Sequence, residues 1–358
     1  MYNCRVNART TDWTLATLVA LLFGTGLLSL VSGSTGDRWL FILHGAGGAA
    51  LGLVTGWKLR RVWRLIVDSG RWSRGSVAGL SSAVLVLAAL LSGWIWASGG
   101  DLVFAGFNLL NWHITLGVLV SLLVLAHALL RAKPFRRRDL DGRRQAIHLA
   151  AMTLVAGLGW WVQRPVAAAA GWRGSQRRWT GSYEAGSFQG NTFPATSWVA
   201  DQPRPLSADS YRLRVDGLVA RPLSLSLADL GTSTTMRATL DCTGGFFSTQ
   251  DWTGVSLGDV LADASPLLAA THVRVVSYTG YRWSFPLHEA ADLLLATAVA
   301  HTPLSHGHGA PVRLVAPGHR GFQWIKWVVR IELLDGPDRG APASTVWSSW
   351  TAEGRGEA

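Results

Sequence analysis

Long apolar segments separated by short polar loops fill the first half of the chain. A helix needs about 20 mostly apolar residues to cross the hydrocarbon core of a bilayer. Five segments approach that length, at residues 13–31, 39–57, 77–97, 107–130 and 147–162, and the last is the shortest. The pattern therefore predicts an all-α bundle of five transmembrane helices within a membrane domain at residues 1–165.

The pattern changes after the fifth segment. Residues 166–190 are polar and rich in Gly and Ser, which is typical of a linker. Alternating apolar and polar positions then predict strands at residues 211–215, 273–278, 311–315 and 327–333, with helical segments near residues 256–264 and 288–294. We therefore expect an α+β domain at residues 191–335, followed by a loose polar tail at residues 336–358.

Basic residues indicate how the chain is oriented. The formal net charge is +11, and most Lys and Arg residues lie in two runs, residues 58–74 and 131–144, that flank apolar segments. Such clusters mark the cytoplasmic side of a membrane, so a nucleic-acid partner is excluded. Because both runs fall on one side, we expect a multi-pass plasma-membrane protein surrounded by lipid. Its N-terminus is predicted to be cytoplasmic and its C-terminal domain extracytoplasmic.

Arg143 and Arg144 allow two interpretations. They precede a modest apolar segment, as in the twin-arginine signal that exports folded proteins. They are equally consistent with two further arginines on the cytoplasmic side.

Four histidines lie in or beside the apolar segments, where polar residues are usually functional. His113 and His127 are fourteen residues apart on the fourth segment, which places them on nearly one helix face and roughly 21 Å apart. The predicted topology puts His44 at the depth of His113, and His148 at the depth of His127. Two bis-histidine haem b groups would suit these pairs, in an arrangement that resembles a di-haem membrane cytochrome b. The alternatives are interfacial histidines without metal, or a proton relay, although few acidic residues accompany them.

The cysteine Cys242 lies in the stretch LDCTGGFFSTQDWTGVSL, far from the other cysteine, Cys4, so a disulfide is not expected. Gly244 and Gly245 follow it and allow the backbone to approach whatever the sulfur binds. This stretch resembles the metal-binding segment of the sulfite oxidase family of molybdopterin enzymes. YRLRVDGLVARPLSLSLADL and HGAPVRLVAPGHRGFQWIKWVVRIEL resemble that family's entry strand and its closing cofactor-binding block. The three motifs stand in the family's order.

The resemblance implies a site. The Cys242 thiolate would be the protein ligand of molybdenum, and the domain would have the sulfite oxidase-type molybdopterin-binding fold. Arg313 and Lys326 would meet the cofactor's phosphate. The full set of implied cofactor contacts is Asn191, Thr279, His308, Arg313, Trp324, Ile325 and Lys326. His308 departs from the Asn that is frequent in the periplasmic methionine sulfoxide reductase branch. His319 and Arg320, in a Pro/Gly loop, are the candidates for binding a substrate oxygen.

These observations predict a membrane-bound molybdenum oxidoreductase similar to the catalytic subunit of the periplasmic methionine sulfoxide reductase, fused to a cytochrome b-like domain. Electrons would move between the quinone pool, one or two haem b groups and a molybdopterin centre. The expected substrate is a small sulfur compound, with reduction of an S-oxide such as methionine sulfoxide preferred. Two alternatives stay open: a sulfite oxidase or dehydrogenase that passes electrons to quinone, and a non-catalytic electron-transfer protein.

Overall fold

The computed structural model describes residues 8–68, 70, 72, 74–131, 143–197 and 200–357. The chain divides into two compact units, one formed by Met1–Leu30 and Thr35–Gly181, the other by Val31–Ser34 and Ser182–Ala358. We call them the helical unit and the sheet unit.

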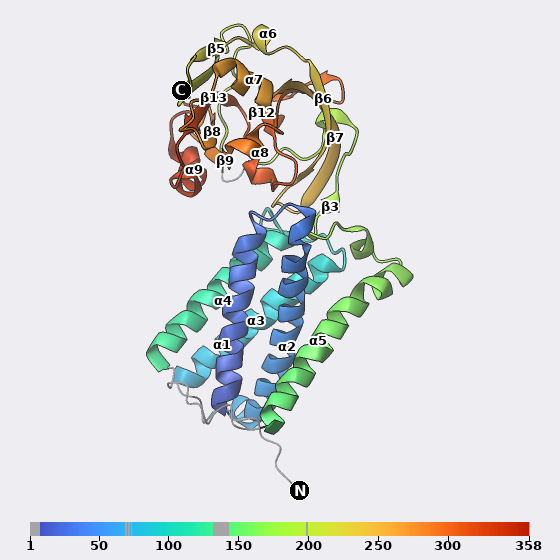
Figure 1. Cartoon of the computed structure of the whole chain (residues 1–358). Coiled ribbons are helices and arrows are strands. Elements are labelled where there is room, and N and C mark those ends of the chain that lie inside the picture. Colours follow the sequence, from blue (N-terminus) through green and yellow to red (C-terminus); the bar gives the residue numbers. More distant parts are fainter. Residues whose placement is uncertain are drawn as a thin grey trace. The chain divides into compact units, whose positions relative to one another are not determined.

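Long helices build the helical unit (Figure 1). They are α1 (Ala8–Ser29), α2 (Arg38–Val67), α3 (Arg74–Ala97), α4 (Leu109–Arg131) and α5 (Arg143–Ala169). Helix α1 packs on α2 and α4, helix α3 packs on α4, and helix α5 packs on α2. Short elements connect or follow them: η1 (Thr35–Asp37), the hairpin of β1 (Val103–Phe104) and β2 (Phe107–Asn108), and η4 (Arg173–Gln176).

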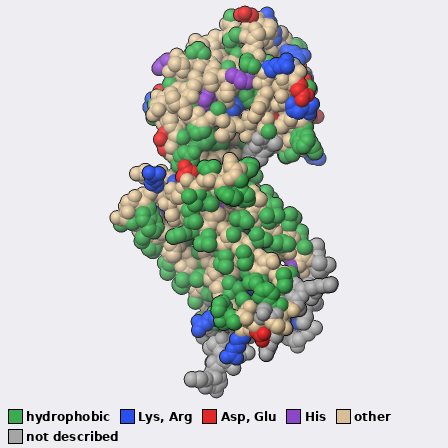
Figure 2. All heavy atoms as spheres, turned by 180° about the vertical axis from the view of Figure 1, so that it is seen from behind, with side chains coloured by type: hydrophobic (Ala, Val, Ile, Leu, Met, Phe, Trp, Pro, Cys, Tyr) green, Lys and Arg blue, Asp and Glu red, His purple; other side chains and the backbone are tan. Residues whose placement is uncertain are grey.

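Four of these helices are long and apolar enough to cross a membrane, within Arg9–Ser29, Thr35–Arg64, Val77–Ala97 and Leu109–His127. The described part of α5 is not among them, and this helix contains Pro165. The count of five spans therefore stays a prediction. Figure 2 shows many hydrophobic side chains on the surface of the helical unit. Leu122, Leu125 and Leu154 are among its exposed residues. Such a surface suits lipid as its solvent.

Glycines in α2 let its neighbours approach closely. A Cβ atom at Gly45 would lie 2.2 Å from the indole of Trp160 on α5, and one at Gly47 would lie 3.2 Å from Leu21 on α1. Small residues at helix interfaces are a usual means of packing helices in lipid, where no hydrophobic effect draws them together. The glycine-rich run of α2 is thus a packing surface on two sides.

Two sheets form the sheet unit. Among the described residues, one sheet joins β11 (Thr302–Pro303), β10 (Leu294–Val299), β7 (Phe246–Ser256) and β3 (Tyr183–Glu184), with β12 (Arg313–Val315) on β10 and β6 (Thr234–Asp241) on β7. The other runs in the order β5 (Leu223–Leu225), β4 (Leu213–Gly217), β13 (Val328–Leu334), β8 (His272–Ser277) and β9 (Arg282–Pro286). The β13–β4 and β3–β7 pairs are parallel, and the other pairs are antiparallel.

Short helices complete the sheet unit: α6 (Leu227–Leu230), α7 (Leu257–Ala264), α8 (Leu287–Ala290), α9 (Ala341–Trp347), η5 (Gly190–Thr192), η6 (His306–His308), η7 (Gly321–Gln323) and η8 (Ser348–Trp350). Strands β7 and β8 alternate buried and partly buried residues, as the period of a strand requires. Their inner faces meet in one core that includes Trp252, Leu294 and Ile331. The α+β architecture expected from the sequence is confirmed.

The C-terminal residues differ from the loose tail that their composition predicts. They form α9 and η8, and the Gln202 amide donates a 2.8 Å hydrogen bond to the carbonyl of Gly354. Ser344 and Ser348 are buried, and each hydroxyl donates within the domain. Composition misled because Ser and Gly pack here as small, hydrogen-bonded residues rather than as solvated ones.

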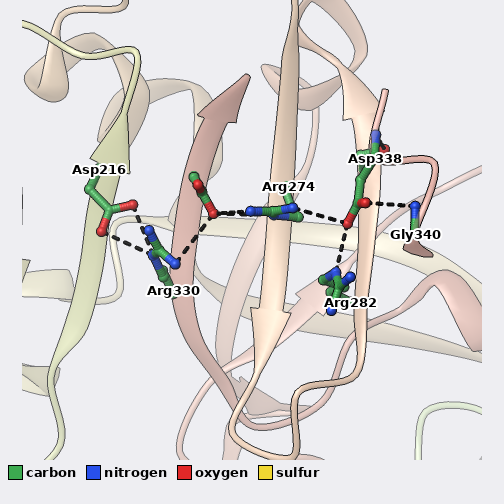
Figure 3. Close-up of polar contacts among 8 residues, drawn as sticks. Asp216, Arg274, Arg282, Arg330, Asp338 and Gly340 are labelled. Atoms are coloured by element: carbon green, nitrogen blue, oxygen red, sulfur yellow. Dashed lines mark hydrogen bonds and ion pairs between the residues drawn. The ribbon is translucent and has the colours of Figure 1, made fainter. Parts of the chain in front are cut away.

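A row of alternating charges crosses the five-stranded sheet and ends on the C-terminal segment (Figure 3). Arg330 on β13 lies 2.9 Å from Asp216 on β4 and 3.4 Å from Glu332 on its own strand. Arg274 on β8 binds Glu332 on one side and Asp338 on the other, at 3.3 Å for the second contact. Each charge in the row therefore has a neighbour of opposite sign.

Asp338 ends this row and fixes the start of the C-terminal segment. Its Oδ2 lies 2.7 Å from Arg282 Nε, and its Oδ1 accepts from the Gly340 amide at 2.9 Å. Burial alone would raise the pKa of the Asp338 carboxyl, but hydrogen bonds from Arg282 and Gly340 outweigh that effect and hold the pKa below its usual value. The charged form is thus the form that the fold stabilises.

The substitution Asp338→Asn is expected to lower the unfolding free energy of the sheet unit by about 1–3 kcal/mol, because two arginines lose a charged acceptor. Folding lowers the pKa of the Asp338 carboxyl below its unfolded value of about 4. The stabilisation that this carboxylate gives the sheet unit is therefore complete above about pH 4, and it is lost as the pH falls through the lower pKa of the folded state. Denaturant unfolding, read by hydrogen exchange of β8 and β9, measures it. The exposed Asp263→Asn is the control; an equal effect of both variants would refute the anchoring role.

Candidate functional site

Cys242 lies at the turn between β6 and β7. Its backbone amide donates to the Phe246 carbonyl at 2.8 Å, and its carbonyl accepts from the Gly245 amide at 3.0 Å. Gly245 has φ +97°, a conformation that side chains with a Cβ rarely adopt. The Gly244 amide points at the sulfur, with 3.3 Å between N and Sγ. The glycine pair therefore shapes the turn that presents the sulfur.

A buried ion pair holds this turn from behind. Arg320 Nη1 lies 2.9 Å from Asp241 Oδ1, and both side chains are almost fully buried. Asp241 also accepts from Ser182 at 2.8 Å, and Arg320 Nη2 is 3.4 Å from the carbonyl of Cys242. A Cβ atom at Gly321 would lie 2.9 Å from the Cα atom of Cys242. The loop after β12 is thus pressed against the cysteine.

A small cavity opens beside the sulfur, with a volume of about 30 Å³. The Thr196 hydroxyl lies 3.4 Å from Sγ. The residues that line this cavity are Phe193, Pro194, Thr196, Leu240, Cys242, Phe246, His308, Arg313, Gly321 and Lys326. Four residues that the sequence predicted for the site, Cys242, His308, Arg313 and Lys326, therefore meet around one cavity.

The cations Arg313 and Lys326 line this cavity; Arg313 is buried and Lys326 is partly buried. Burial lowers the pKa of Arg313 to about 10 and that of Lys326 to about 7, and in each case the negative charge of Cys242 opposes the shift. Among the described residues neither makes an ion pair with a carboxylate. Arg313 Nε has no hydrogen-bond partner, although Nη1 donates to the His308 carbonyl at 3.0 Å. Lys326 Nζ donates to the carbonyls of Thr196 and Gly307, each at 2.6 Å.

His308 is held as a neutral imidazole. Burial, and then the positive charges of Arg313 and Lys326, lower its pKa to about 4, against a backbone hydrogen bond that raises it. Nε2 lies 2.8 Å from the carbonyl of Phe193, which can only accept, so Nε2 carries the proton. Nδ1 then accepts from the Ser305 hydroxyl at 2.7 Å. Both ring nitrogens are used within the protein.

A second and larger cavity, of about 420 Å³, shares Lys326 with the first. Its lining is Ala195, Ser197, Ala200, Asp201, Gln202, Pro203, His306, Gly307, Lys326 and Trp327. Thr279, a predicted cofactor contact, donates to Asp201 at 2.8 Å. The cavity wall therefore includes one carboxylate, one imidazole and one ammonium group.

The other predicted residues support these cavities from outside. Asn191 binds the Pro303 carbonyl and the Ser305 amide, each at 2.9 Å, and so holds the segment that leads to His308. Trp324 and Ile325 are buried, and the Trp324 ring lies 5.8 Å from the Arg313 guanidinium. His319 and Arg320 line neither cavity: His319 packs on Phe285 and lies 3.5 Å from Glu289.

Sequence reasoning missed Thr196, Asp201, His306 and Tyr281. Burial, followed by the negative charges of Asp201 and Cys242, raises the pKa of Tyr281 well above its usual value. Its hydroxyl donates to the Phe322 carbonyl at 2.6 Å. The spacing TGYRWSFP gave no chemical signal for this residue, because a tyrosine in an alternating strand pattern indicates only a core position.

His44 on α2 and His113 on α4 lie together within the helical unit, with 6.1 Å between ring centres and an angle of 80°. His113 Nδ1 is 2.8 Å from the Ala89 carbonyl, so that nitrogen carries the proton. His44 Nδ1 is 2.9 Å from the Thr25 hydroxyl, whose own proton is directed to Leu21. Both Nε2 atoms are then unprotonated. Gly93 makes room: a Cβ there would lie 2.8 Å from His113.

The second histidine pair, His127 and His148, stays a prediction. His127 is exposed on α4. His148 belongs to α5, and its side chain, like those of Arg143 and Arg144, lies outside the described residues.

The geometry makes Arg320 a positioning residue. The substitution Arg320→Leu leaves the Asp241 carboxylate buried without its cation, so we expect the unfolding free energy to fall by roughly 3–5 kcal/mol. The exposed His288→Asn, which lies on neither cavity, is the control. Denaturant unfolding and substrate KM are measured together. A raised KM with unchanged stability for Arg320→Leu would instead support the predicted contact with substrate.

Comparison with known proteins supports a molybdopterin site. Residues 200–341 match the family model described as oxidoreductase molybdopterin binding domain. Sulfite oxidase of Gallus gallus is 37% identical over 157 residues, which are 34% of this chain and 34% of that protein. Mitochondrial sulfite oxidase of Homo sapiens is 35% identical over 162 residues, 36% of this chain and 30% of that protein.

The protein-methionine-sulfoxide reductase catalytic subunit MsrP of Gluconobacter oxydans is 31% identical over 175 residues, 43% of this chain and 54% of that protein. The chain thus spans about a third to about half of these relatives. The crystal structure of the sulfane dehydrogenase SoxCD from Paracoccus pantotrophus matches 38% of this chain and 41% of that chain, with 29% identity and a TM-score of 0.36. The chain therefore carries a molybdopterin-binding oxidoreductase domain similar to sulfite oxidase and MsrP.

Proposed function

We propose that the chain is a membrane-bound molybdenum oxidoreductase that reduces S-oxides such as methionine sulfoxide, with electrons from the quinone pool delivered through haem b. The observation that carries this proposal is the Cys242 sulfur at a cavity whose other charged groups are two cations, the buried Arg313 and the partly buried Lys326. A buried cation without a carboxylate partner is costly unless an anion meets it.

The side chains present suit molybdopterin. Cys242 would hold the metal through its thiolate, the form in which a coordinated cysteine exists. Arg313 and Lys326 would bind the anionic groups of the cofactor. The Arg313 Nε–H group makes no hydrogen bond to the described residues, so it can donate one to the cofactor. When bound, the cofactor supplies transfer of an oxygen atom together with two electrons. The same cations favour a substrate with a negative or strongly dipolar oxygen.

The neutral His308 contributes shape and position rather than charge. Its ring closes the cavity wall, and its carbonyl binds the Arg313 guanidinium. Trp252 and Trp324 lie 5.4 and 5.8 Å from that guanidinium, which stabilises the cation by its interaction with the ring faces. The protein thus fixes the direction of Arg313 before any ligand arrives.

His44 and His113 would hold the iron of a haem b. Each anchored Nδ1–H leaves Nε2 with its lone pair, which is the tautomer that binds a metal. The two rings come from different helices and lie close together, with 6.1 Å between ring centres. A second haem between His127 and His148, at the depth where quinol would deliver electrons, completes the proposed path.

Sulfite oxidation in the reverse electron direction is the second candidate. The 37% and 35% identity to the sulfite oxidases of Gallus gallus and Homo sapiens favours it. The two candidates share every residue above and differ in the direction of electron flow.

The substitution His113→Leu should abolish the low-spin absorption bands of one haem, because one axial ligand is lost. His44→Leu should do the same. His127→Leu serves as the control and should leave this haem unchanged while affecting the other. Optical spectra of the dithionite-reduced, detergent-purified chain measure the result. Wild-type bands in both His113→Leu and His44→Leu would exclude this haem site.

Methionine sulfoxide added to anaerobically reduced chain should reoxidise the haem, and Cys242→Ser should slow this at least a thousandfold, as expected on loss of the metal ligand. Cys4→Ser controls for loss of a cysteine and should retain the wild-type rate. Two results together would establish the second candidate instead. Methionine sulfoxide would leave the haem of the reduced chain reduced, and sulfite would reduce the haem of the oxidised chain.

A further inference from the structure

Thr25 of α1 is a buried threonine whose hydroxyl meets the ring of His44 on α2. Its exposed fraction is 6%, and its Oγ1 atom lies 2.9 Å from His44 Nδ1. The backbone of α1 is close to the same ring, since a Cβ atom at Gly26 would lie 3.7 Å from His44 Cε1. The Nδ1 edge of His44 therefore faces α1, where Thr25 supplies a polar group.

The hydroxyl proton of Thr25 is used within α1. Its Oγ1 atom donates to the carbonyls of Leu21 at 2.8 Å and Leu22 at 3.1 Å. A hydroxyl has one proton and two lone pairs, so a proton that is given to α1 leaves Oγ1 as an acceptor for the Nδ1–H group of His44. Thr25 therefore accepts the proton of this ring instead of donating one to it.

The other histidine of the pair has a different acceptor. His113 Nδ1 lies 2.8 Å from the Ala89 carbonyl, whereas the Ser92 hydroxyl is 3.4 Å away. Ser92 is also buried, and its hydroxyl donates to the Ala89 carbonyl at 2.8 Å. Each ring thus lies beside a buried hydroxyl group on another helix, but only His44 has that hydroxyl group as its near acceptor.

We propose that Thr25 is a positioning residue that lowers the reduction potential of the haem held by His44. The inference rests on the proposed haem site. A hydrogen bond from Nδ1–H makes the imidazole more basic at Nε2, and a more basic ligand stabilises ferric iron over ferrous iron. A lower potential makes the reduced haem a stronger electron donor, which is what reduction of an S-oxide requires. Ala89 binds His113 through its backbone, so Thr25 makes the one of these two bonds that a side-chain substitution removes.

Four variants of the full chain separate this bond from the mere presence of a buried hydroxyl group. Thr25→Val has nearly the same shape without the hydroxyl, Thr25→Ala lacks it and cannot overfill the site, and Thr25→Ser keeps it. Ser92→Ala is the matched control, because it removes the hydroxyl group beside the other ring. Haem reduction in detergent is titrated against potential, and the redox component that His113→Leu lacks is the one followed. EPR spectra of the ferric chain report on the axial ligands.

We expect Thr25→Val and Thr25→Ala to raise the ratio of reduced to oxidised haem at a fixed potential at least about threefold, or about 28 mV at about 59 mV per tenfold change for a one-electron couple. Thr25→Ser should restore the wild-type ratio, and Ser92→Ala should keep it. A wild-type ratio in Thr25→Val and Thr25→Ala, or an equal shift in Ser92→Ala, would overturn the inference while leaving the proposed haem in place. Wild-type chain without low-spin haem bands would overturn the proposed haem together with it.

Discussion

Two cations that have no carboxylate partner among the described residues, the buried Arg313 and the partly buried Lys326, are the constraint around which the sheet unit is arranged. Arg313 and Lys326 lie beside the Cys242 sulfur, and burial lowers the pKa of Lys326 to about 7. The fold offsets this cost with dipoles: the carbonyls of His308, Thr196 and Gly307 all face these two side chains. Neutral acceptors stabilise a cation less than a carboxylate does, so the site keeps a net attraction for an anion. An ion pair at either position would have made a more stable domain with a weaker site.

The helical unit fixes the tautomer of two neighbouring histidines. His44 and His113 lie with 6.1 Å between ring centres, and the Nδ1 proton of each ring is held by a group on another helix. Ala89 and Thr25 accept those protons from the neighbouring helices α3 and α1. Gly93 supplies the space, since any larger residue would meet the His113 ring. Residues that carry no metal chemistry of their own thus decide the tautomer and the distance between the rings.

The sequence was informative where the chemistry is local. Apolar length predicted the helices, and Cys242, Arg313 and Lys326 belong to motifs that the structure brings to one cavity. It was uninformative where a partner lies far along the chain. Arg320 looked like a residue displayed on a Pro/Gly loop, but Asp241, which fixes it in the interior, is 79 positions earlier. Asp201 and the serines of η8 are 147 and 148 positions apart, so no local pattern could show that the C-terminal segment holds the carboxylate of the larger cavity.

His308 shows why the departure from asparagine at this position is chemically small. One nitrogen of its ring donates to the Phe193 carbonyl and the other accepts from the Ser305 hydroxyl. An asparagine amide also offers one donor and one acceptor within reach of two partners, so it could replace both bonds. The contact with Arg313 uses the backbone carbonyl, which any residue supplies. What the position requires is therefore a neutral side chain with one donor and one acceptor. The low pKa of His308, set by burial and by the two cations, keeps an imidazole in that form.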